Sequence, residues 1–210
     1  MTLLLPSLNH LPPPGSGIDS FTCRPSLNGK YSLKHTIEAL ASPTPPAPWY
    51  QLVWNSLSIP RHWVILWLAV LNKLPTLDSN SMAYKHIPNH CTLCLSSGES
   101  LNHIFFSCSF TAPIWSYLQN ACSFYTRSQW IDFIFWASRH WSSKSIANAI
   151  NKLALSTSIY HIWAERNSRI FKDISSSQNS ILFKITTSIR ERLLPLSFKD
   201  GVAAQRVRHV

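Results

Sequence analysis

Apolar residues recur every three or four positions along most of the chain from Trp49 onward. This spacing places them on one face of a helix, which can then pack against a core. Prolines and polar runs separate the periodic stretches, and Pro195 stops the last one. The pattern predicts helices over residues 49–59, 61–73, a short segment capped by Thr76, 110–121, 129–138, 143–171 and 180–194.

The longest predicted helix, 143–171, starts at a Ser143 cap and carries a stripe that repeats near 3.5 residues. The stripe contains one polar residue, Thr157, and is otherwise formed by Ile146, Ile150, Leu153, Tyr160 and Ala164. A heptad-like stripe packs either within its own chain or against a second copy. A homo-oligomer held through this helix is therefore one expectation.

The N-terminal part of the chain has a different character. Residues 1–18 are rich in proline and glycine and are expected to be loose. Asn28-Gly29 lies between two short runs and suits a tight turn, so residues 19–41 predict a β-hairpin followed by a short helix that begins near Ser32. The linker at 42–48 holds four prolines and cannot be helical. We expect a separate domain at 49–122, a helical region at 123–195 and a basic tail at 196–210.

Charge is unevenly distributed over the 210 residues. The chain has 19 Lys and Arg against 9 Asp and Glu, a formal net charge of +10. Most of the excess lies in residues 139–210. Such a basic region suggests a polyanionic partner, most often nucleic acid, although a solvated basic surface without a partner is the alternative.

The five cysteines do not form the pattern of a secreted, disulfide-linked chain. Their number is odd, and three of them fall between residues 91 and 108. We expect a reduced, intracellular protein. The most apolar stretch, Trp63–Leu71, is far shorter than the roughly 20 residues of a membrane span, so no membrane association is expected.

The clustered cysteines predict a metal site formed by Cys91, Cys94, His103 and Cys108. Two cysteines three positions apart can reach one ion from a single turn, and a second pair closes the tetrahedron. A Cys3His set leaves no open position, so the ion is expected to be one structural Zn²⁺. The alternative is ordinary buried thiols with a core histidine, and His90 is the substitute fourth ligand.

The spacing of the second ligand pair conflicts with a regular helix. Positions five apart on an α-helix point about 140° apart. His103 and Cys108 should therefore not both lie within one, and we expect a turn or a helix end between them. The predicted fold is mostly α: an irregular helical domain around a small Cys3His zinc knuckle, with an N-terminal β-hairpin and a C-terminal pair of long helices.

The run from Trp49 to Trp115 resembles the zinc-binding domain that follows the reverse transcriptase in plant non-LTR (LINE-type) retrotransposons. The matching residues are Val53-Trp54, Ile59-Pro60-Arg61, Trp67-Leu68-Ala69, Leu74-Pro75-Thr76, Cys91, Cys94, Glu99, His103-Ile104-Phe105-Phe106, Cys108 and Trp115. Residues 19–40 and 162–171 resemble the segments that flank that domain. The family usually has Trp where this chain has Cys23.

The resemblance implies the C-terminal fragment of an element's protein, with a nuclear location. A reverse transcriptase needs paired aspartates for its metal ions, and this chain has no Asp-Asp pair. Motifs of an endonuclease or a ribonuclease H are also missing, so no enzymatic activity is expected. A decayed copy of the element, without present activity, is an alternative interpretation.

In that family the zinc domain is thought to help the protein grip RNA or DNA. Candidate phosphate contacts here are Arg61, Lys73, Lys85, Arg166, Arg169, Lys172, Lys184, Arg190 and Arg192. A protein-interaction or scaffold domain without nucleic-acid affinity is the competing hypothesis.

Overall fold

The computed structural model describes residues 32–40, 45–78, 90–122 and 129–195. The chain divides into two units, 1–45 and 46–210, with the division inside the proline-rich stretch. In the first unit α1 (Leu33–Leu40) confirms the predicted short helix. Its Thr36 amide and hydroxyl both donate to the Ser32 carbonyl. The predicted β-hairpin lies outside the described residues.

The second unit is mostly helical, as predicted. Its elements are α2 (Tyr50–Val53), α3 (Pro60–Val70), the π-helix η3 (His103–Ser107), α4 (Ala112–Cys122), α5 (Trp130–His140), α6 (Ile146–Lys172) and α7 (Gln178–Leu193). The predicted pair of long C-terminal helices is present as α6 and α7. None of the described helices is long and apolar enough to cross a membrane.

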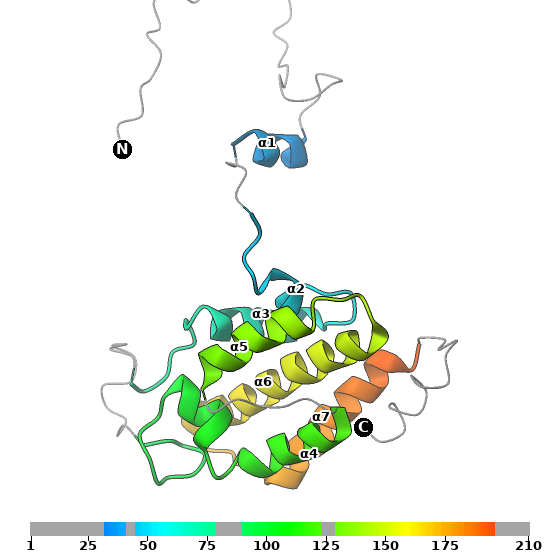
Figure 1. Cartoon of the computed structure of the whole chain (residues 1–210). Coiled ribbons are helices and arrows are strands. Elements are labelled where there is room, and N and C mark those ends of the chain that lie inside the picture. The colour runs from blue at the N-terminus through cyan, green and yellow to red at the C-terminus, as the bar shows by residue number, and fades with distance from the viewer. Residues whose placement is uncertain (1–31, 41–44, 79–89, 123–128, 196–210) are drawn as a thin grey trace, which may run out of the picture. The chain divides into compact units, whose positions relative to one another are not determined.

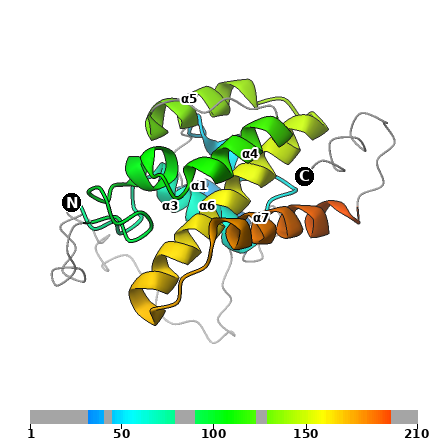
Figure 2. The same ribbon diagram turned by 90° about the horizontal axis from the view of Figure 1, so that it is seen from below.

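Helix α6 is the centre of this unit. It packs against α3 and α7 along its length and also touches α4 and η3. Figure 1 shows α6 between α3 and α5 on one side and α4 and α7 on the other, and Figure 2 shows α7 returning beside it. Every residue from Ile150 to Ile159 is buried. Within the heptad-like stripe, Ile150, Leu153 and Thr157 are therefore buried in the chain, whereas Ile146 and Ala164 are exposed. Association with a second copy through this helix stays a prediction.

Two predicted helices differ from the structure. The helix expected over 49–59 ends at Val53, because the Asn55 side chain donates to the Leu52 carbonyl and the Ser58 hydroxyl and forms a turn instead. Pro60 then opens α3, where its missing N–H costs nothing. The short helix expected at Thr76 is absent from the described residues 76–78, where the Thr76 hydroxyl bonds Asp78.

The start of α6 also differs from prediction. Its cap is Ser145, whose hydroxyl accepts from the Asn148 amide at 3.2 Å, while Ser143 lies outside the helix and donates to Ser145. A serine cap satisfies one of the amides that the first helical turn leaves free. The helix ends at Asp173 in the left-handed conformation, and Ser177 caps α7 in the same way as Ser145 caps α6.

Aromatic side chains join the η3 segment to the rest of the core. The rings of Phe105 and Phe106 pack against Trp130 of α5, with centroids 5.2 and 5.7 Å apart. The Trp130 indole donates to the Ala69 carbonyl of α3, and its amide donates to the Asn102 side chain. These contacts hold the polypeptide around residues 102–108 in a fixed position against two helices.

Candidate metal centre

Four side chains converge at one end of the second unit: Cys91, Cys94, His103 and Cys108. Each offers one ligand atom, and these atoms all lie within 4.8 Å of one another. The Cys91 and Cys108 sulfurs are 3.8 Å apart, and the Cys94 sulfur is 3.3 Å from His103 Nε2. The structure thus brings together the four residues that the spacing predicted.

These separations suit a tetrahedral zinc ion. Bonds of about 2.3 Å to sulfur and about 2.0–2.1 Å to nitrogen place two sulfurs about 3.8 Å apart and a sulfur and a nitrogen about 3.6 Å apart. Cys91 and Cys108 are buried, and Cys94 and His103 are half-buried. Since all four positions come from the protein, the ion would cross-link two chain segments and would have no position for a substrate.

The loop that carries the first two ligands is folded by its own backbone. The Leu95 amide donates to the Cys91 carbonyl, and the Cys91 amide donates to the Ser97 carbonyl, both at 2.7 Å. Leu95 closes this turn with a φ of 60°, in the left-handed region that normally favours glycine. The Ser96 hydroxyl donates to the Cys94 sulfur at 3.3 Å. The CxxC segment is therefore a tight knuckle, as expected.

The second ligand pair is carried by the π-helix. The Cys108 amide donates to the His103 carbonyl at 2.8 Å, five residues back, and Cys108 itself is extended. A π-turn has more residues than an α-turn, so positions five apart come closer to one face. The predicted helix end between the two ligands is confirmed, while the π geometry that aligns them was not predicted.

Hydrogen bonds brace both ends of this π-helix. Ser100 accepts from the His103 amide through its hydroxyl and from the Ile104 amide through its carbonyl. The Thr111 hydroxyl is buried and donates to the Ile104 and Cys108 carbonyls. Satisfied buried groups of this kind stabilise the backbone that carries His103 and Cys108.

The two buried thiols are coupled. The hydrogen bond to Cys108, followed by burial, raises the pKa of Cys91, and the same hydrogen bond lowers the pKa of Cys108. His90, the substitute ligand considered above, is exposed and does not belong to the cluster.

Arg169 connects the knuckle to α6. Its guanidinium donates to the carbonyls of Thr92 and Leu93, between the two CxxC cysteines, at 3.1 and 3.0 Å. It also bonds the Glu165 carboxylate at 2.9 Å. The prediction that Arg169 contacts phosphate is therefore wrong, because its donors already bind the metal-site loop.

Arg166 was likewise expected on the surface and is fully buried. Its guanidinium donates to both oxygens of Glu99, with a shortest distance of 2.6 Å, and lies over the Trp163 ring. Glu99 is itself buried and also accepts from the Leu77 amide at 2.9 Å. A buried ion pair positions elements rather than presenting charge to a partner, so Arg166 is corrected to a structural residue.

Sequence reasoning missed the roles of the two glutamates. Glu165 is buried and accepts from Arg169 and from the Ser176 amide. Glu99 was noted as a motif residue, without a partner. No local signal identified this pairing, because Glu99 and Arg166 lie 67 positions apart in the chain.

The other candidate phosphate contacts remain at the surface, with Lys85 outside the described residues. Arg61, Lys73, Lys172, Lys184, Arg190 and Arg192 are exposed. Lys73 follows the end of α3, and Lys172 closes α6. These six residues keep the location that binding to a polyanion requires.

Comparison with known proteins supports the metal site. Residues 31–115 match a family model described as zinc-binding in reverse transcriptase. No curated protein and no solved structure gave a significant match to the chain. The chain therefore carries a reverse-transcriptase-type zinc-binding segment over residues 31–115, and all four ligands lie inside it.

Proposed function

We propose that this chain is a non-catalytic zinc-binding module that binds RNA or DNA through a basic surface. The observation that carries the proposal is the gathering of three exposed cations on the side where α3 and α7 meet α6. We call Arg61, Lys184 and Arg192 the α3–α7 basic surface. Zinc would act at a distance from this surface, by holding the fold that presents it.

Two observations support this grouping of the three cations. Burial, and then the charges of Lys184 and Arg61, lower the pKa of His161 to about 4. Both cations therefore act on one imidazole of α6, although they come from different helices. Arg192 donates to the carbonyls of Ser56 and Leu57, in the loop just before α3.

Arg61 and Lys184 of this surface are available for a polyanion, whereas two Arg192 donors already bind the Ser56 and Leu57 carbonyls. Among the described residues no carboxylate pairs with Arg61, Lys184 or Arg192. The paired arginines, Arg166 and Arg169, face the interior instead. Since the chain carries a net charge of +10, its long-range field also attracts nucleic acid.

A salt titration tests the proposal. We would measure fluorescence anisotropy of a labelled single-stranded RNA and a single-stranded DNA with the zinc-loaded full chain, at several salt concentrations. Phosphate contacts predict that log K falls linearly with log salt, with a slope of about −0.7 per contact on single strands.

The variant Arg61→Gln with Lys184→Gln should weaken binding and make the slope shallower by about 1.4. The matched control, Lys34→Gln with Arg139→Gln, removes the same charge from exposed residues elsewhere and should keep the wild-type slope. If both variants changed the affinity and the salt slope equally, binding would depend on net charge alone and not on the α3–α7 basic surface. Absence of binding at low salt would favour the helical interaction domain.

A further inference from the structure

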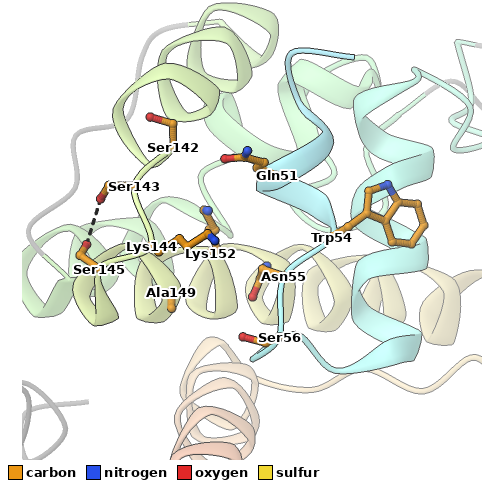
Figure 3. Close-up of a pocket in the computed structure, with 10 residues that line it drawn as sticks. All are labelled: Gln51, Trp54, Asn55, Ser56, Ser142, Ser143, Lys144, Ser145, Ala149 and Lys152. Carbon is orange, nitrogen blue, oxygen red and sulfur yellow. Dashed lines mark hydrogen bonds between the residues drawn. The ribbon is translucent and has the colours of Figure 1, made fainter. Parts of the chain in front are cut away.

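A cavity of about 350 Å³ opens between α2, the turn at 142–145 and the first turns of α6 (Figure 3). This volume lies within the range of about 300–1,000 Å³ typical of small-ligand pockets. Ser145 and Ala149 form its floor on one face of α6, and the small Ala149 side chain leaves the space open. None of the described residues that line the cavity is acidic.

Lys152 is the unusual residue of this cavity. It lies on the same face of α6 as Ser145 and Ala149, lines the cavity, and is only 6% exposed. Among the residues that the structure describes, none accepts a hydrogen bond from its ammonium group. Burial lowers its pKa, since the charged form has lost water without gaining a counter-charge.

Two further sources of positive potential face the same space. Lys144 lines the cavity, and Figure 3 draws its side chain close to that of Lys152. The N-terminus of the 27-residue helix α6 adds the equivalent of roughly half a positive charge. Two lysines and a helix terminus, with no acidic residue in the described lining, form an environment that a doubly charged anion would neutralise.

We propose that this cavity binds the dianionic phosphate group of a phosphomonoester or of inorganic phosphate. The oxyanion accepts hydrogen bonds from Lys152 and Lys144 and lies against the N-terminal end of α6. The Trp54 indole points away from the lysines in Figure 3, so the pocket recognises phosphate rather than a nucleobase. The inference goes beyond the proposed function, because these residues are different from those of the α3–α7 basic surface.

The test is a calorimetric titration of the zinc-loaded full chain with inorganic phosphate at constant ionic strength. The wild type should bind one phosphate. Lys152→Met removes the charge and keeps the shape, and should weaken binding about tenfold or more, as expected for a lost charge-assisted hydrogen bond. The matched control, Lys34→Met, removes an exposed lysine elsewhere and should bind like the wild type.

A second variant leaves both lysines intact. Ala149→Leu fills the cavity and should also abolish binding, whereas circular dichroism should show the wild-type helix content. Failure of the wild type to bind, or wild-type affinity in either cavity variant, would overturn the inference and leave water as the occupant.

An oligonucleotide identifies the source of the phosphate. Tighter binding of a 5′-phosphorylated strand than of its 5′-hydroxyl form, lost in Lys152→Met, supports the cavity as a site for a nucleic-acid end. Equal binding of the two strands alongside retained phosphate binding supports a small phosphorylated ligand. Phosphate binding without any affinity for strands would remove the proposed function and leave this inference standing.

Discussion

Removing the charge of Arg166 should destabilise the protein far more than removing a surface arginine. Its guanidinium is fully buried, donates to both oxygens of Glu99 and lies 4.8 Å from the Trp163 ring centroid. In Arg166→Met the carboxylate of Glu99 stays buried, and its remaining partner among the described residues is the Leu77 amide. A buried charge left without its counter-charge is strongly destabilising.

The structure sets the expected magnitude. Breaking one side of a buried ion pair costs about 3–5 kcal/mol, so Arg166→Met should lower the free energy of unfolding by that amount. Glu99→Gln should cost a similar amount, because it leaves the guanidinium uncompensated while an oxygen still accepts from Leu77. The double variant removes both charges, so its loss of stability should be smaller than the sum of the two single losses by about 0.5–3 kcal/mol.

Urea unfolding of the zinc-loaded chain, followed by circular dichroism, measures these values in a double-mutant cycle. Arg190→Met is the matched control, since Arg190 is an exposed arginine of α7, and should change the free energy of unfolding by no more than about 0.5 kcal/mol. If Arg166→Met behaved like this control, or if the two single effects simply added, the Glu99–Arg166 pair would not be the buried clamp described here.

Three further predictions concern the knuckle and the buried histidines. Cys94→Ser should lose zinc and unfold the segment around it, because a structural ion contributes on the order of 10 kcal/mol to the free energy of folding. Metal analysis by mass spectrometry checks the loss. The control Cys122→Ser lies outside the cluster and should keep its zinc. Leu95→Gly should stabilise the protein by about 0.5–1 kcal/mol in urea unfolding, since Leu95 is 74% exposed and has a φ of 60°; a loss of stability would contradict the strain argument. Burial, followed by the charges of His161 and Arg61, lowers the pKa of His62 from 6.5 to about 3. The folded state therefore resists protonation of His62, and its stability should fall as pH drops from 6.5 toward 3. His62→Phe should reduce that dependence in a pH series of urea unfolding, while the acid release of zinc, common to both proteins, cancels in the comparison.

Local patterns accounted for much of the fold and for the whole ligand set. Helical periodicity located α3, α4, α5, α6 and α7 to within a few residues, because an apolar stripe at this spacing has a single way to become buried. The predicted helix at 49–59 failed for a local reason as well: a short polar side chain, Asn55, competed for backbone groups. The four zinc ligands were identifiable because they lie within eighteen consecutive positions.

Local patterns misassigned two arginines, Arg166 and Arg169, as phosphate contacts. Arg166 and Arg169 carry the same charge as Lys172 and Lys184, and nothing in their immediate neighbours distinguishes an interior clamp from a phosphate contact. The distinction depends on where Glu99 and the Thr92 and Leu93 carbonyls lie, and these are 67 to 77 positions away in the chain.

The amino-acid sequence by itself determined which residues could ligate zinc and which stretches could form helices, because both properties depend on neighbours within a few turns. Tertiary structure alone decided that η3 takes a π-turn that aligns His103 with Cys108 and that Arg169 braces the knuckle. It also decided that Lys152 faces a cavity whose described lining holds no acidic residue. The physical reason is that burial and electrostatic pairing are properties of contacts between distant segments, which exist only once α6 has packed against the rest of the chain.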